Sequence, residues 1–337
     1  MKPVFIIAEA GVNHNGNLDM ALQLVDKAAE IGVDCIKFQT FKTEENITLR
    51  APKAAYQLEV TDRNESQFDM IKKLELDQAA FTAIKKHCDK KGVLFMSTPY
   101  TPGDVDLLES VGVDRYKVAS AQLVETPFLK YVAKTGKPVI ISTGMGTMQE
   151  VREAVEAIRS TGNNQITVLQ CNTDYPSKIE DTNIRAMVTM RDELKVQAGY
   201  SDHVPNNYAC YAAVALGAEV IEKHFTLDNS LPGPDHSSSL EPAAFKELIS
   251  GIRNIEKALG TGIKTPSESE KKNIFAMRRS LVAKAPLKKG TVLTEDMLGT
   301  KRPANGLSPK VLGEVLGKTL LKDLEQDEAL TWEGIKS

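Results

Sequence analysis

The chain is poor in histidine, cysteine and tryptophan, and it has no excess of basic residues. Its 337 residues include five histidines, four cysteines and one tryptophan, and the formal net charge is −3. Without a basic field, the chain is not expected to bind nucleic acid or an anionic membrane through its overall charge. Any anionic substrate must therefore be held by a local cluster of lysine, arginine and backbone amide groups.

Long hydrophobic runs and closely spaced cysteines are absent as well. No apolar run approaches the length of a membrane span, and the N-terminal stretch MKPVFIIAEAGVNHNG is apolar only briefly. The cysteines show no CxxC spacing, which is typical of reduced thiols rather than of a disulfide framework. They are Cys35, Cys88, Cys171 and Cys210. From these absences we expect a cytoplasmic enzyme.

Short apolar runs recur through the first three-quarters of the chain and alternate with segments of helical period. Such runs are typical of strands that are buried on both faces of a parallel sheet. Eight strand–helix units in series predict a (β/α)₈ barrel, or TIM barrel, with its functional groups at the carboxyl ends of the strands. The predicted strands span residues 4–10, 34–40, 93–99, 115–121, 138–144, 166–172, 196–202 and 219–225.

The sequence predicts two domains joined by a linker. Residues 1–260 form the barrel, and the polar segment 261–275, with its proline and serines, is the predicted linker. Residues 276–337 form a small separate domain with short β-like runs and glycine turns. Within the barrel, residues 41–74 are long for a loop, and long loops at such a position usually carry function or cover a site.

Polar side chains end all eight predicted strands, where a barrel carries its chemistry. Two of them, Lys37 and Lys117, can neutralise an anion with several charges. Hydroxyl groups and nearby amides would complete a cradle for phosphate and carboxylate. These hydroxyls belong to Thr98, Ser120, Ser142 and Ser201. The alternatives are that the hydroxyls cap helices and that the lysines form structural ion pairs with Glu9 or Asp34.

Two of the five histidines, His203 and His224, end adjacent predicted strands. Such a pair can bind a divalent metal with positions open for substrate oxygens, and the ligand types suit Mn²⁺, Fe²⁺ or Zn²⁺ equally. Two isolated structural histidines are the alternative, but Asp202 and Glu222 beside the pair favour a metal site. Glu9 and Glu222 are candidates for proton transfer in the same mouth.

Several motifs together resemble the sialic acid synthases. In chain order they are IIAEAGVNHNG (6–16), IKFQTF (36–41), STP (97–99), STGM (142–145), GYSDH (199–203), IEKHFTLD (221–228) and PGPDH (232–236). The later stretches KRPANGLSP (301–309) and LGKTL (316–320) resemble the small C-terminal antifreeze-like domain of these enzymes, a β-clip or SAF domain. The resemblance covers nearly the whole chain in order, and the combination is highly specific.

The resemblance implies condensation of phosphoenolpyruvate with N-acetylmannosamine and water, which yields N-acetylneuraminate and phosphate. His203 and His224 would hold Mn²⁺ to polarise the aldehyde, and Glu9 and Glu222 would manage the water and its protons, with their roles undivided. Phosphoenolpyruvate would contact Lys37, Thr98, Lys117, Ser120, Ser142 and Ser201. The sugar would contact Gln39, Tyr175, Asp235 and Arg302, the last from the partner subunit of a domain-swapped homodimer.

The chain departs from the family pattern at two places. Ser120-Ala121-Gln122 replaces the usual Ser-Gly-Glu, so a carboxylate is lost, and Asn172-Thr173 reverses a common order. Synthases of N,N′-diacetyllegionaminate or pseudaminate, which take a deoxy sugar with two acetamido groups, are the nearest alternative. A sugar-phosphate synthase would need a second basic pocket that the strand ends lack. A non-catalytic sugar-binding barrel is a further alternative, opposed by the intact histidines, lysines and glutamates.

Overall fold

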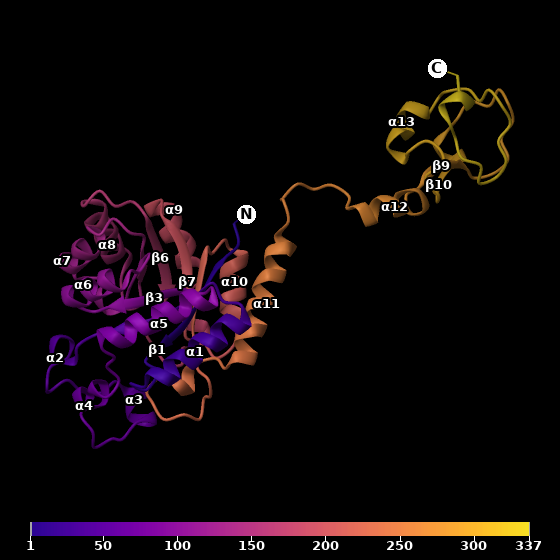
Figure 1. Cartoon of the computed structure of the whole chain (residues 1–337). Helices are drawn as coiled ribbons and strands as arrows, with labels where there is room; N and C mark the ends of the chain where they lie inside the picture. Colours follow the sequence, from indigo (N-terminus) through magenta and orange to yellow (C-terminus); the bar gives the residue numbers. More distant parts are fainter. Residues whose placement is uncertain (1, 337) are drawn as a thin grey trace. The chain divides into compact units, whose positions relative to one another are not determined.

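The structure is a computed structural model that describes residues 2–336, apart from the side chains of residues 55, 56 and 59. Contacts within the chain divide it into two compact units, residues 1–260 and 261–337 (Figure 1). Residues 1 and 337, which end the two predicted domains, lie outside the described residues. The predicted linker, 261–275, belongs to the second unit and contains most of helix α12 (Glu268–Met277). A capping box of Ser267 and Glu270 begins this helix, and the linker prediction overlooked that signal.

Eight parallel strands form the sheet of the first unit, in the order β3-β2-β1-β8-β7-β6-β5-β4. The two ends of this order, β3 and β4, pack against each other and close the sheet. The predicted TIM barrel is confirmed. The strands are β1 (Phe5–Gly11), β2 (Cys35–Thr40), β3 (Leu94–Pro99), β4 (Tyr116–Val118), β5 (Val139–Ser142), β6 (Ile166–Cys171), β7 (Gln197–Asp202) and β8 (Val220–His224).

Helices follow the strands, and the main hydrophobic core lies between the two layers. The local signals are clear in the first of them, because Asn17 caps its N-terminus and Gly32 ends it with a left-handed backbone. The helices are α1 (Leu18–Ile31), α5 (Gln78–Lys91), α6 (Pro102–Val111), α7 (Thr126–Ala133), α8 (Met148–Arg159), α9 (Arg185–Leu194), α10 (Tyr208–Ala215) and α11 (Pro242–Leu259). A separate apolar layer fills the barrel interior, from Ile7, Cys35, Met96, Ile140, Leu169 and Val220.

The long segment 41–74 contains three short helices, which gather at one end of the barrel in Figure 1. They are α2 (Thr43–Asn46), α3 (Ala55–Val60) and α4 (Gln67–Lys72). A small apolar cluster, separate from the main core, anchors the segment to the barrel through Val12, Phe41 and Leu74. The segment is therefore an ordered part of the barrel.

The second unit has its own hydrophobic core, which includes Leu281, Leu298, Val315 and Leu330. Its strands β9 (Ser280–Ala283) and β10 (Leu298–Lys301) pair antiparallel, and a short helix, α13 (Leu312–Val315), follows them. Within residues 2–336, no helix combines the length and hydrophobicity that a membrane span requires.

Candidate active site

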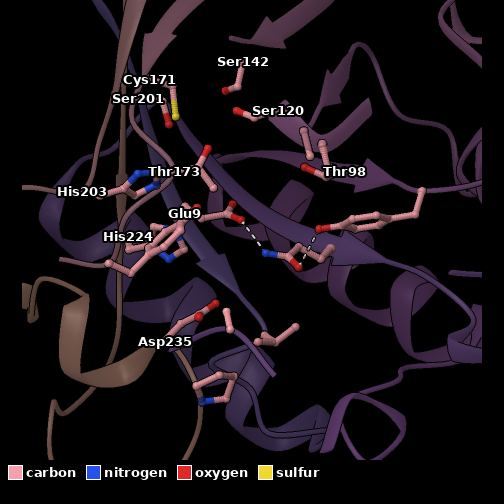
Figure 2. A pocket seen from close by; sticks show the side chains of 18 of the residues that line it. Glu9, Thr98, Ser120, Ser142, Cys171, Thr173, Ser201, His203, His224 and Asp235 are labelled. Carbon is pink, nitrogen blue, oxygen red and sulfur yellow. Dashed lines mark hydrogen bonds between the residues drawn. The ribbon is translucent and has the colours of Figure 1, made fainter. Parts of the chain in front are cut away.

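A cavity of about 770 Å³ opens at the carboxyl ends of the barrel strands. Every predicted site residue of the first unit lines it. Figure 2 shows labelled side chains, among them Glu9, Ser142 and His203, that converge from different strands. We call the charged and hydroxyl side chains of its strand ends the floor, defined as Glu9, Lys37, Lys117, Ser142, Ser201 and Glu222. All six are buried.

The floor is a network of buried ion pairs and hydrogen bonds. The Lys37 Nζ lies 2.6 Å from Glu9 Oε2 and donates a hydrogen bond to Thr98 Oγ1 at 3.1 Å. The Lys117 Nζ donates to Ser142 Oγ at 2.6 Å. Glu222 lies between the two lysines, at 3.8 Å from Lys37 and 3.7 Å from Lys117. The alternative of a Lys37–Glu9 ion pair is thus realised in the structure, inside the cavity rather than away from it.

The two carboxyl groups of the floor have opposite pKa shifts. Burial raises the pKa of Glu9 to about 7, because the opposing charge of Lys37 does not outweigh desolvation and the charge of Glu222. Burial acts in the same direction on Glu222, but Lys117 and Lys37 outweigh it and lower the pKa of that carboxyl. At neutral pH the carboxyl group of Glu222 is therefore ionised, whereas that of Glu9 is protonated in part of the molecules.

Hydroxyl groups and a backbone amide gather next to Lys117. The Gly144 amide donates to Ser120 Oγ at 3.0 Å, and Ser201 Oγ donates to Glu222 Oε1 at 3.0 Å. A Cβ atom at Gly144 would lie 2.2 Å from Thr173 Oγ1 and 2.9 Å from Ser120 Oγ, so this cradle requires glycine. Two cations with converging hydroxyls and an amide suit an anion such as phosphate.

The two histidines face each other across neighbouring strands, with ring centroids 5.3 Å apart (Figure 2). The Nδ1–H of His203 donates to the Asn172 carbonyl at 2.5 Å. Burial alone would lower the pKa of His203, but Cys171, which hydrogen-bonds to the ring, and the Asn172 carbonyl raise it. His224 Nδ1 is buried without a partner, and burial together with His203 lowers the pKa of His224 well below its usual value. Once His203 has given up its proton, the two imidazole nitrogens fit a divalent metal as two of its ligands. Among the described residues, no three His, Cys, Asp or Glu side chains form a fuller metal cage.

Behind the histidines, a second ion pair joins the same two strands. Asp202 and Lys223 alternate with the cavity-facing residues and are themselves fully buried outside the cavity lining. They form an ion pair, and Lys223 Nζ also donates to the carbonyls of Val204 and Asn206. The sequence interpretation used Asp202, next to His203, as support for a metal site, but strand alternation turns this side chain away from the cavity.

The remaining predicted sugar contacts occupy one side of the cavity. Gln39 Nε2 donates to Glu9 Oε1 at 3.2 Å, and the Tyr175 ring lies 4.1 Å from the His203 ring. Asp235 is buried, which raises its pKa to about 6. Arg302 belongs to the second unit, where its Nε donates to the Met277 carbonyl at 3.1 Å.

Sequence reasoning missed several residues of the cavity. Tyr100 donates its hydroxyl hydrogen bond to Gln39 Oε1 at 3.0 Å, and Cys171 lies against the His203 ring. Of Asn172 and Thr173, whose order departs from the family pattern, Thr173 lines the cavity, while Asn172 Nδ2 donates to the Asp181 carbonyl. Gln122, which replaces the family's glutamate, is outside the lining and donates to the Tyr100 carbonyl. The positions just after strands β3 and β6 were the available signal for Tyr100 and Thr173.

Comparisons with known proteins agree with this site. The chain belongs to the NeuB family, whose model matches residues 24–264, and an SAF domain model matches residues 278–336. It is an enzyme of the phosphoenolpyruvate-dependent nonulosonic acid synthase class.

Three similar proteins illustrate the range of the family. The chain is 47% identical to the N,N′-diacetyllegionaminic acid synthase of Campylobacter jejuni subsp. jejuni serotype O:2, over 98% of this chain and 99% of the other. It is 37% identical to the pseudaminic acid synthase of Campylobacter jejuni subsp. jejuni serotype O:23/36, over 98% and 96%. The crystal structure of a sialic acid synthetase from Leptospira borgpetersenii has 33% identity and a TM-score of 0.73, over 81% of this chain and 90% of that one. The sequence interpretation placed N-acetylneuraminate synthesis first. The higher identity to the N,N′-diacetyllegionaminic acid synthase fits its alternative better.

Proposed function

We propose that the chain condenses phosphoenolpyruvate with 2,4-diacetamido-2,4,6-trideoxymannose and water, to give N,N′-diacetyllegionaminate and phosphate. The choice of sugar rests on the 47% sequence identity, over nearly the whole of both chains, to a synthase of that product. The cavity supports the reaction type, because it combines a cationic, hydroxyl-rich floor with two facing imidazoles.

Phosphoenolpyruvate is assigned to the floor. Lys37 and Lys117 supply the positive charge, and the surrounding hydroxyls supply hydrogen-bond donors for phosphate and carboxylate oxygens. The contributing hydroxyls are those of Thr98, Ser120, Ser142 and Ser201, with Thr173 completing the cradle. The Gly144 amide holds Ser120 in place by donating to its hydroxyl oxygen. Burial of the site strengthens these charge interactions, because little water remains to screen them.

His203 and His224 are assigned as ligands of a divalent metal, with Mn²⁺ as the proposed ion. When bound, the metal supplies Lewis-acid polarisation of the sugar aldehyde. Support comes from the partnerless buried nitrogen of His224 and from the backbone hydrogen bond that orients His203. That hydrogen bond fixes the tautomer of the His203 ring, as the outer partners of metal-binding histidines commonly do.

The two glutamates divide the proton transfers. C3 of phosphoenolpyruvate forms a bond to the aldehyde carbon, whose oxygen takes up a proton from Glu9, the carboxyl with a pKa of about 7. Glu222, held ionised between the lysines, accepts a proton from the water that adds to C2. The bond between C2 and the phosphate oxygen then breaks while the added hydroxyl becomes the carbonyl of the 2-keto acid, and the hydroxyl proton leaves with the phosphate. Gln39 lies against Glu9, which keeps the proton donor on the side of the sugar.

The sugar is assigned to Gln39, Tyr175 and Asp235. The contact from Arg302 of a partner subunit, and with it the domain-swapped homodimer, stays a prediction. Mixing His224→Ala chains with Arg302→Ala chains tests it, because a shared site would restore part of the activity in the mixed dimers. Mixtures as inactive as the separate variants would contradict the swap.

Phosphate release tests the proposed function. Purified protein, phosphoenolpyruvate and Mn²⁺ are assayed with the diacetamido sugar or with N-acetylmannosamine, side by side. We expect a higher kcat/KM with the diacetamido sugar. A preference for N-acetylmannosamine would move the chain to the sialic acid branch with the same mechanism, and no release with either sugar would overturn the catalytic proposal.

A further inference from the structure

One part of the cavity lining comes from one contiguous piece of chain. Besides Ala54, six side chains of the segment 41–74 line the cavity, and we call these six the outer wall: Phe41, Asn46, Ile47, Gln57, Gln67 and Ile71. None of them belongs to the residues assigned to phosphoenolpyruvate, metal or proton transfer. The outer wall therefore has a role that the proposed chemistry leaves unexplained.

The outer wall is neutral although its segment is highly charged. Residues 41–74 contain twelve charged residues, and none of the eleven whose side chains the structure describes lines the cavity. Several pair on the surface instead, as Lys72 does with Glu44 at 2.8 Å and Lys73 does with Glu65 at 2.5 Å. A phosphorylated sugar would require lysine or arginine here. The outer wall is suited to uncharged substituents.

Two side-chain amides give the outer wall hydrogen-bonding capacity. Gln57 is buried, and its Oε1 accepts hydrogen bonds from the Ala54 amide at 2.9 Å and from Gln67 Nε2 at 3.4 Å. Among the described residues, nothing donates to the carbonyl oxygen of Gln67. An acetamido group offers one N–H donor and one carbonyl acceptor, which are the complement of a glutamine amide.

Apolar side chains form the rest of the outer wall. Phe41 and Ile71 belong to the small cluster of Val12 and Leu74, and the Phe41 ring packs edge-on against Tyr100 at 6.0 Å. Tyr100 in turn donates to Gln39, the predicted sugar contact. The wall is thus continuous with the sugar side of the cavity, and its apolar surface suits methyl groups better than hydroxyls.

We propose that the outer wall selects the sugar by receiving its 4-acetamido group at Gln67, which Gln57 positions, and its C6 methyl group against Ile47, Phe41 and Ile71. N-acetylmannosamine carries hydroxyls at both positions, which would lose water against apolar side chains without gaining partners. The inference rests on the proposed function and adds to it the residues that distinguish these substrates.

Gln67→Met tests the part of the proposal that concerns the amide. Methionine keeps the length of the side chain and removes both the N–H donors and the carbonyl acceptor of the amide. We expect kcat/KM for the diacetamido sugar to fall about tenfold, the equivalent of two hydrogen bonds. The values for N-acetylmannosamine and the KM of phosphoenolpyruvate stay unchanged. Gln149→Met, on the exposed surface of α8, is the matched control and leaves every value unchanged.

Ile47→Thr tests the methyl part with a second pair of sugars, 2-acetamido-2,6-dideoxymannose and N-acetylmannosamine. These differ only by the C6 hydroxyl. The wild type favours the 6-deoxy sugar, and the variant loses most of that preference, by about fivefold, because the ethyl branch of the isoleucine is replaced by a hydroxyl.

Equal losses with all sugars would overturn the inference, since they would indicate a structural role, and so would unchanged preferences. No phosphate release from the wild type with the diacetamido sugar would instead refute the proposed function. If a comparison sugar does not react, calorimetry with the open-chain alditols measures the same preferences as dissociation constants. Those constants would then decide for or against the outer wall.

Discussion

The floor of the cavity consists of charged side chains on strand ends, whereas the outer wall consists of neutral side chains on a segment with three short helices. The floor residues lie on or next to the strands of a parallel sheet, and ion pairs hold the charged ones, such as Lys37 with Glu9 at 2.6 Å. The outer wall is held by a small apolar cluster and by surface ion pairs.

This difference separates two tasks within one site. Bond formation requires charges that are held in place, and a closed barrel supplies rigid positions for them. Choice of sugar requires a surface that can change without moving those charges. Substitutions in the floor should therefore affect every sugar equally, whereas substitutions in the outer wall should change the ratio between sugars.

The largest effect is expected for His224→Ala. The variant should lose at least 99% of turnover with either sugar, and its bound metal should fall in parallel, because one of two imidazole ligands is gone. Turnover and metal content after dialysis are measured, with His87→Ala, a histidine paired with Asp26 on α5 and α1, as the control. Full activity in His224→Ala would remove the metal assignment.

The next effect is expected for Gly144→Ala. The added Cβ would meet Thr173 and Ser120, so the anion cradle must open. We expect kcat/KM for phosphoenolpyruvate to fall about a hundredfold with both sugars, as displacements near 1 Å at a reacting group commonly cause. Steady-state kinetics in phosphoenolpyruvate checks this, and a loss confined to one sugar would break the division between floor and outer wall.

Lys223→Met removes one member of the buried ion pair with Asp202, which lies outside the cavity on the strands that carry the histidines. Removing one member of a buried ion pair leaves Asp202 without its counter-charge, which destabilises the fold by about 3 kcal/mol. Metal affinity should also fall about tenfold, because the two strands that carry the histidines lose the ion pair that joins them. Urea unfolding and metal titration measure these effects. The double variant Asp202→Asn with Lys223→Met should recover stability, and if it unfolds as easily as the single variant, the ion-pair explanation is wrong.

The pH dependence of stability reports on Glu9. The folded protein holds this proton up to about pH 7, above the ordinary value of 4.5 for an unfolded glutamic acid. The raised pKa therefore contributes stability below pH 4.5 that is lost as the pH rises through 7. Relative to Glu9→Gln, the wild type should lose free energy of unfolding over this range. Urea unfolding of both metal-free proteins at several pH values checks it, and parallel curves would contradict the assignment.

The smallest effect is expected on the outer surface of the segment that carries the outer wall. Lys72, whose side chain is 44% exposed, pairs with Glu44 and Glu75. Lys72→Ala should change the free energy of unfolding by less than about 1 kcal/mol and leave the sugar preference unchanged, because exposed ion pairs contribute little. A shift in sugar preference would show that the surface pairs position the outer wall.

The floor could be predicted from the sequence because a parallel barrel brings all carboxyl strand ends together, whatever their separation along the chain. Lys37, Lys117 and the two histidines follow from that rule alone. Asp202 was misplaced because its neighbours faced the cavity, while the alternation of the strand turned it outward.

The outer wall could not be predicted in the same way. Gln57 and Gln67 sit in a polar segment without helical or strand period, so nothing local distinguishes them from the charged residues around them. Their place in the cavity depends on how α3 and α4 pack, which involves contacts far apart in the chain. Tyr100 was missed for a similar reason, since its role depends on reaching Gln39 from another strand.

The outer wall enters the barrel as a single uninterrupted stretch between β2 and α5. Because it carries no group assigned to bond making, it can be exchanged as a block while the catalytic strands remain untouched. A barrel of this kind lends itself to engineering by cassette: one scaffold with several interchangeable segments 41–74 would yield a set of enzymes that make different nine-carbon acids.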